Sequence, residues 1–117
     1  MERYVQVMRE LMGNIGLEGV SLVSLDGLPI ASVLKSGMEE DRIAAMSAAI
    51  LSLGERVSEE LAKGALEQIT IKGTNGYVIL TGVGENAVLV TLADNNVKLG
   101  LLLIEIKKTQ DKLRGIM

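Results

Sequence analysis

The chain has 117 residues, 48% of them hydrophobic, a formal net charge of −3, and neither cysteine nor histidine. These numbers favour one domain (residues 1–117) with a core of its own, and they exclude a disulfide scaffold, a thiolate or imidazole metal site and a Ser-His-Asp triad. Basic residues are scattered and only two residues are aromatic, so we expect no nucleic-acid binding. The sequence has no phosphate-binding loop of the G-x-x-x-x-G-K-[ST] type, and we expect no cofactor.

The first third of the chain predicts a helix followed by a hairpin. Apolar residues recur at helical spacing over residues 2–15, and charged residues interrupt this stretch, which is not typical of a signal peptide. Strands are predicted at 19–25 and 28–35, joined by a turn at Asp26-Gly27. Even the stretch LGLLLIEI at 99–106 is too short to span a bilayer, so we expect a cytoplasmic protein without membrane insertion.

A long middle helix is predicted from about residue 39 to residue 63, where Gly64 ends it. One apolar stripe of this helix is expected to face the core, and it consists of Ile43, Met46, Ile50, Val57 and Leu61. Small or apolar residues also occupy the rest of its circumference between Ala44 and Gly54. A helix that is apolar nearly all round is usually buried on more than one side.

Three strands and a helix complete the pattern. The run 66–72 alternates between apolar and polar residues, whereas 77–83 and 86–93 are apolar on both faces. Glycine-containing turns join these runs, and the G-x-G-x-x-A match at 82–87 is interpreted as such a turn because it lies between strands. The last helix, 97–114, has an apolar face formed by Leu99, Leu102, Leu103, Ile106 and Leu113. Short connections between strands predict a largely antiparallel sheet.

Five strands form a sheet about 24 Å wide, while one helix covers only about 10 Å of it. With three helices, two can cover one face of the sheet. The middle helix then lies alone on the other face and covers only about half of it. A second copy, related by a two-fold axis, would complete the cover. The expected dimer interface combines the middle helix with the alternating strand: Ala44, Ala45, Ala48, Ala49, Leu51, Ser52, Gln68, Thr70 and Lys72.

This order of elements resembles the Roadblock / dynein light chain family over nearly the whole chain. The residues that carry the resemblance are GVSLVSLDGLPIAS, RIAAMSAAILSLGERVSEEL, LEQITIKGTNGYVILTGVGENAVLVTLA and NNVKLGLLLIEI. The resemblance implies a profilin-like α/β (α+β) fold, with a five-stranded antiparallel sheet between helices. It also implies a homodimer built on paired middle helices and paired third strands, and a role in regulating or scaffolding small Ras-like GTPases.

The expected function is therefore that of a non-catalytic, homodimeric regulator or scaffold. The partner-binding candidates on the polar side of the middle helix are Arg42, Ser52, Arg56 and Glu59. Two alternatives stay open: a small-molecule sensor of the PAS or profilin type, and a constitutive structural subunit of a larger assembly. A sensor requires a cavity with converging polar groups.

Overall fold

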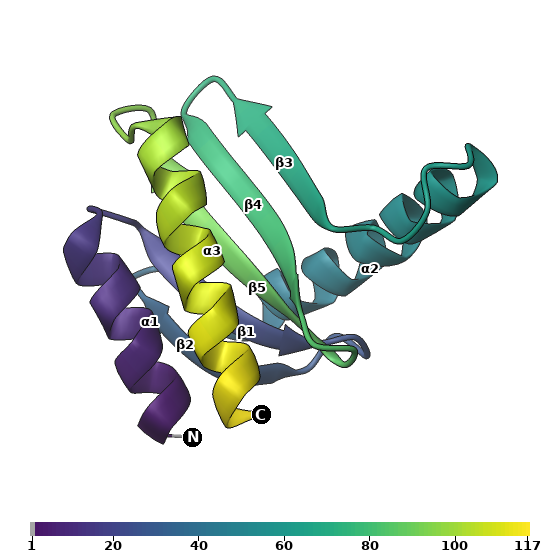
Figure 1. Cartoon of the computed structure of the whole chain (residues 1–117). Coiled ribbons are helices and arrows are strands. Elements are labelled where there is room, and N and C mark those ends of the chain that lie inside the picture. Colours follow the sequence, from purple (N-terminus) through teal and green to yellow (C-terminus); the bar gives the residue numbers. More distant parts are fainter. Residues whose placement is uncertain (1) are drawn as a thin grey trace.

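The computed structural model describes residues 2–117 and contains eight elements in chain order (Figure 1). They are α1 (Glu2–Asn14), β1 (Gly19–Ser24), β2 (Pro29–Leu34), α2 (Glu40–Glu60), β3 (Gln68–Gly73), β4 (Gly76–Val83), β5 (Ala87–Asp94) and α3 (Leu99–Ile116). This order is the one predicted from the sequence, and most boundaries agree within a few residues.

The five strands form one antiparallel sheet in the order β2-β1-β5-β4-β3. The central ladder joins β1 to β5, with Val20 opposite Thr91. Tight turns produce the outer hairpins, since β1 leads directly into β2 and β3 into β4. The predicted fold class is therefore confirmed. β3 forms one edge of the sheet and is hydrogen-bonded to a neighbour on one side only.

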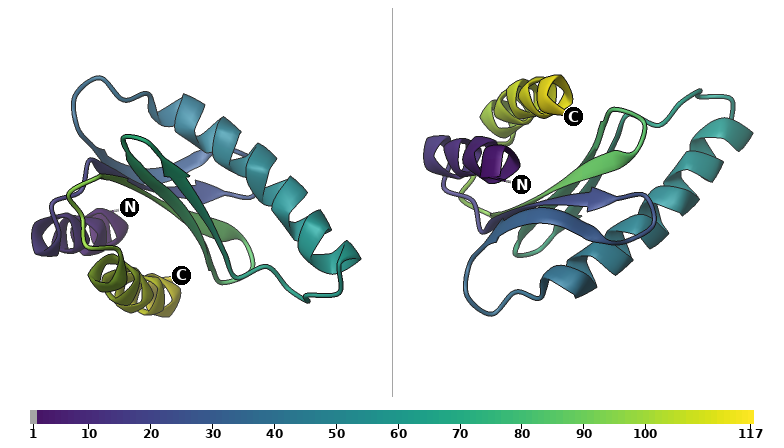
Figure 2. Two further views of the ribbon diagram at one scale, coloured as in Figure 1. Left: turned by 90° about the horizontal axis from the view of Figure 1, so that it is seen from above. Right: turned by 90° about the horizontal axis from the view of Figure 1, so that it is seen from below.

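Helices cover the two faces of the sheet unequally (Figure 2). α1 and α3 lie side by side on one face, and their contact with the sheet forms the larger core cluster, which includes Met8, Leu22, Leu89 and Ile106. α2 lies alone on the other face, over a smaller cluster that includes Ala44, Leu80 and Val90. As expected from the width of the sheet, two helices cover one face and a single helix covers part of the other. The side chains of α2 determine how much apolar surface is left exposed on that second face.

Among residues 2–117, two buried threonine hydroxyls on the α1/α3 side of the sheet make no hydrogen bond, Thr81 Oγ1 and Thr91 Oγ1. The Thr91 side chain is 1% exposed. Burying an unpaired hydroxyl costs about 1–3 kcal/mol, whereas an isosteric methyl group has no such cost.

We therefore expect Thr91→Val to raise the free energy of unfolding by about 1 kcal/mol, measured by urea denaturation. Thr109→Val is the matched control, because the Thr109 hydroxyl donates a hydrogen bond to the Glu105 carbonyl at 3.0 Å. This control should lower the stability. Equal changes in the two variants would contradict the prediction.

Candidate interaction surface on the middle helix

The side of α2 that faces the sheet is made of small residues and one leucine. Ala44, Ser47 and Leu51 are the buried residues of this helix. Ala44 is fully buried and Leu51 is 9% exposed, so the structure corrects the sequence-based interface in these two positions: both belong to the chain's own core. Small side chains let the helix axis approach the sheet closely. At Gly54, a Cβ atom would lie only 2.7 Å from Ile69 Cδ1.

A second side of α2, together with the C-cap residue Leu61, is apolar. We name it the apolar flank, and it consists of Ile43, Met46, Ile50, Leu53, Val57 and Leu61. The exposed fractions are 55% for Met46, 60% for Leu53, 47% for Val57 and 66% for Leu61. The prediction that Ile43, Met46, Ile50, Val57 and Leu61 form a core stripe is therefore wrong for Met46, Val57 and Leu61, and Ile43 and Ile50 are only half-buried. The smaller residues have taken the core-facing position instead.

An open groove runs between the apolar flank and the uncovered part of the sheet. Ile43, Met46 and Ile50 line it from the helix, and Ile71, Val78 and Leu92 are among its sheet residues. Its volume is about 300 Å³. The C-terminal half of α2 continues beyond β3, past the edge of the sheet (Figure 1). The flank and the groove together leave a continuous apolar surface, of the kind that marks interaction sites on soluble proteins.

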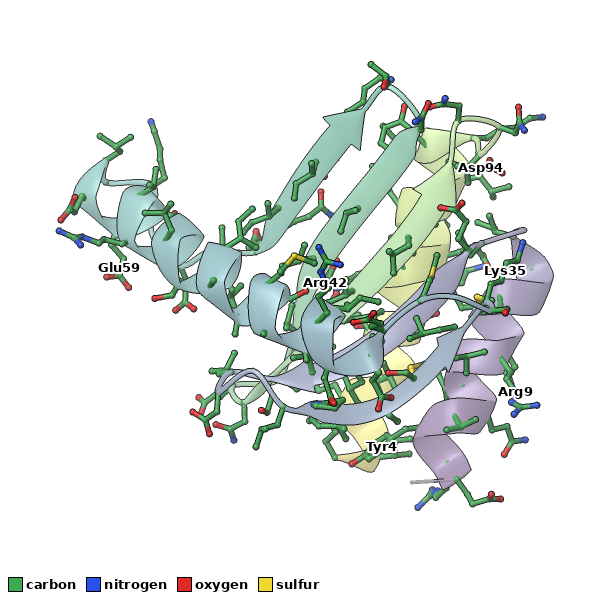
Figure 3. The ribbon with its side chains drawn as sticks, turned by 180° about the vertical axis from the view of Figure 1, so that it is seen from behind. Tyr4, Arg9, Lys35, Arg42, Glu59 and Asp94 are labelled. Carbon is green, nitrogen blue, oxygen red and sulfur yellow. The ribbon has the colours of Figure 1, made fainter. Side chains whose placement is uncertain are left out.

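The third side of α2 points away from the sheet and contains most of the other predicted residues. Ala45, Ala49 and Ser52 are exposed there, and Ala48 is partly covered by the β1–β2 turn at Gly27. The partner candidates Arg42 and Glu59 lie toward opposite ends of the helix (Figure 3). Arg56 is exposed and its Nε lies 3.3 Å from Glu60 Oε1. We name this side, with Arg42, Ala45, Ala49, Ser52, Arg56 and Glu59, the outer face.

The remaining predicted interface residues lie on β3, at the open edge of the sheet. Gln68, Thr70 and Lys72 are all exposed, on the opposite sheet face from α2. The Thr70 hydroxyl donates to Gln68 Oε1 at 3.1 Å, and Lys72 Nζ lies 5.0 Å from the centre of the Tyr77 ring. The backbone groups on the outer side of β3 are free to pair with another strand.

Catalytic and ligand-binding features are sparse in residues 2–117. No three Asp or Glu side chains in that range are placed to hold a metal ion, and no helix in it is long and apolar enough to cross a bilayer. A small-molecule sensor requires polar groups that converge on a cavity, and the hydroxyl groups of Ser21, Ser24, Thr81 and Thr91 do not converge. Ser21 Oγ lies 2.8 Å from Ser32 Oγ, Ser24 Oγ accepts a hydrogen bond from the Leu28 amide, and the two unpaired threonine hydroxyls are enclosed in the core.

Hydrogen bonds from other side chains perturb one carboxyl group. The Asn14 amide donates to Glu105 Oε1 at 2.9 Å, and Lys108 Nζ lies 3.3 Å from Glu105 Oε2. Both interactions favour the ionised form, and they lower the pKa of Glu105 below its ordinary value, the Asn14 hydrogen bond having the larger effect. This pair connects α1 to α3.

Because the pKa of Glu105 is lower in the folded state than in the unfolded state, its carboxylate stabilises the fold at pH values above the unfolded-state pKa. That contribution is lost as the pH falls through the lower, folded-state pKa. We expect Asn14→Ala to move the pKa of Glu105 upward, toward the ordinary value, in an NMR titration of its side-chain carboxyl carbon. Gln6→Ala on the same helix should leave this pKa unchanged. An unchanged pKa in Asn14→Ala would contradict the assignment.

The fold defines a class of small α/β modules in which one sheet lies between two helices and a single, partly exposed helix. Residues 4–93 match the family model described as the Roadblock/LC7 domain. An uncharacterised protein of Methanocaldococcus jannaschii is 36% identical over 111 residues, which cover 95% of this chain and 96% of that protein. The chain therefore belongs to the Roadblock/LC7 domain family, and the resemblance inferred from its sequence is confirmed.

Solved structures agree on the fold. Myxococcus xanthus MglB superposes with a TM-score of 0.92 at 24% identity, over 97% of this chain and 93% of that chain. Profilin II of Acanthamoeba castellanii superposes with a TM-score of 0.63 at 18% identity, over 96% and 94% of the two chains. The expected profilin-like architecture is thus confirmed, and at these identities the likeness concerns the fold alone.

Proposed function

We propose that the protein is a non-catalytic, cytoplasmic homodimer that regulates or scaffolds a small Ras-like GTPase. The observation that carries the proposal is the unpartnered apolar flank of α2, which stands beside an open groove and an open sheet edge. Met46, Leu53 and Val57 each expose about half of their surface or more. Exposed apolar area of this extent is costly in water, and its burial would stabilise an assembly.

A second copy of the chain fits this surface by symmetry. Two-fold pairing of β3 with the partner's β3 would extend the sheet and satisfy the free backbone groups of Gln68–Gly73. The same operation would bring the half of α2 that projects beyond β3 over the partner's groove (Figure 1). Both apolar flanks would then be buried together, while the two outer faces would remain side by side in solvent. This arrangement keeps the β3 edge of the interface expected from the sequence, but the apolar flank takes the place of Ala45, Ala48, Ala49 and Ser52.

The paired outer faces offer a broad, shallow surface for another protein. Ala45, Ala49 and Ser52 form its floor, and charged side chains of both signs, Arg42, Arg56 and Glu59, border it. Membership of the Roadblock/LC7 family supports a Ras-like GTPase as the partner. Such a regulator needs no nucleophile of its own, because it can act by ordering the GTPase switch loops.

Light scattering during size exclusion tests both parts of the proposal. The protein alone should have twice the mass of the 12.5 kDa chain. Ras-like GTPases from the same genome are then added, loaded with GDP or with a non-hydrolysable GTP analogue, and one of them should form a complex. In Ala49→Glu the dimer mass should persist while the complex is lost. A monomeric wild type would overturn the dimer, and the absence of any complex would overturn the choice of partner.

A further inference from the structure

A small pocket lies on the side of α2 opposite to the groove, at the end of the sheet where the β1–β2 and β4–β5 turns meet. Apolar side chains line its floor, namely Leu25, Leu51, Leu66, Leu80 and Ala87. Three carboxylates stand around them: Glu55 on α2, Glu67 just before β3, and Glu85 in the β4–β5 turn. Residues far apart in the sequence thus form an apolar floor with an acidic rim.

The rim is negative without compensation from the chain itself. No ion pair within residues 2–117 includes any of the three carboxylates, and no lysine or arginine lines the pocket. Arg56, the neighbour of Glu55, is directed to Glu60 instead. Like charges around a concave, low-dielectric surface concentrate a negative potential there, which attracts cations.

The size of the pocket limits what it can hold. Its volume is about 120 Å³, well below the roughly 300–1,000 Å³ typical of sites for metabolites and cofactors. A cavity of about 150 Å³ accommodates a group the size of benzene, so this pocket fits one side chain. Leu25, 43% exposed, and Leu28, 65% exposed, extend the apolar surface along the β1–β2 turn toward solvent.

We propose that this pocket binds a peptide segment of a partner protein, taking one lysine or arginine side chain between flanking apolar residues. The aliphatic stem of such a side chain would lie against Leu25, Leu51 and Leu66, and its charged head would reach the three carboxylates. The neighbouring apolar residues of the peptide would rest on Leu28. The pocket shares no residue with the apolar flank or the outer face, so the inference does not depend on a GTPase. Gln68, which also lines it, lies on the β3 edge that pairs in the proposed dimer, so the pocket is tested in the dimeric protein.

A titration followed by NMR on the full-length, ¹⁵N-labelled protein tests the pocket. The probe is the blocked tripeptide Leu-Arg-Leu, and Leu-Glu-Leu is its charge-reversed counterpart. We expect Leu-Arg-Leu to shift the amide signals of Leu66, Gly82 and Gly84, and Leu-Glu-Leu to leave them in place. Raising the ionic strength should weaken the binding, because the carboxylates are at the surface.

Variants separate local recognition from general attraction to an acidic protein. The triple variant E55Q/E67Q/E85Q should bind Leu-Arg-Leu about tenfold more weakly or not at all. The control E2Q/E18Q/E39Q removes the same net charge away from the pocket and should bind as the wild type does. Equal weakening in both variants would overturn the proposal. So would shifts that avoid the pocket, or equal shifts with Leu-Glu-Leu.

Discussion

Replacing Gly76 by alanine should lower the free energy of unfolding by about 4 kcal/mol or more, the range of the most damaging single substitutions. Gly76 begins β4 with a φ of +145°, a conformation that L side chains rarely adopt. A Cβ atom at this position would overlap the carbonyl oxygen of Ala93 and lie 2.9 Å from Asp94 Cα. Both atoms belong to the backbone of β5, so the strain can be relieved only by separating β4 from β5.

Gly73→Ala is a control within the same hairpin. Its φ is not in the left-handed region, and the nearest atom to a Cβ there is the Gly76 oxygen at 3.9 Å. We expect a change of less than about 1 kcal/mol in this variant. Urea denaturation of the two variants measures the difference directly. A Gly76→Ala protein as stable as Gly73→Ala would mean that the β3–β4 turn is not held as described.

The double variant Met46→Glu/Leu53→Glu should be a folded monomer. Both side chains are more than half exposed in the isolated chain, so glutamate costs the monomer little. In the proposed dimer, each copy would bury two carboxylates in an apolar interface, which is strongly unfavourable. The dimer dissociation constant should rise by about 1,000-fold or more, equivalent to about 4 kcal/mol. Analytical ultracentrifugation over a range of concentrations gives this constant.

Ala45→Glu/Ala49→Glu is the matched control, because it adds two carboxylates to the outer face of the same helix. It should remain dimeric with a dissociation constant within about tenfold of the wild type. Circular dichroism on both variants verifies that the helices are intact. If the Met46/Leu53 variant dimerised as the wild type does, the apolar flank would be excluded as the interface. If only the Ala45/Ala49 variant dissociated, the interface would lie on the outer face.

Hydrophobic periodicity predicted the elements because most strands and helices here have strong local patterns. Gly73 and Gly76 bracket the β3–β4 turn, and β3 alternates with period two. The number of helices and the width of the sheet predicted a half-bare face, and the structure has one. These inferences succeed because the spacing of apolar residues along the sequence determines which face of a helix or strand they occupy, and that spacing can be read directly from the sequence.

The orientation of α2 was not predictable in the same way. Two apolar arcs recur with the same helical period, one of large residues and one that contains Ala44 and Leu51. Periodicity does not say which arc faces the chain's own sheet. The deciding signal is Gly54, whose missing side chain admits Ile69 and Leu66 close to the helix. A close approach requires small residues inside, and the large residues Met46 and Val57 are displaced to the exposed flank.

The acidic pocket was also outside the reach of sequence reasoning. Glu55, Glu67 and Glu85 belong to a helix, a loop and a turn, with no common spacing. Only the pairing of β4 with β3 and with β5, together with the path of α2, brings the three segments to one end of the sheet. Individual exposed glutamates in a sequence of this composition are otherwise typical of a solvated surface.

The central ladder has a consequence for how the chain folds. Val20 and Thr91, which are opposite each other in β1 and β5, are separated in the sequence by β2, α2, β3 and β4. Closing so long a loop costs entropy before its contacts form, and contacts of this kind slow folding. Both core clusters include residues of β5, so neither can be completed during synthesis until β5 has been made. Until then, the apolar side chains of α2 are exposed on both sides, and the nascent chain is at its most vulnerable to aggregation.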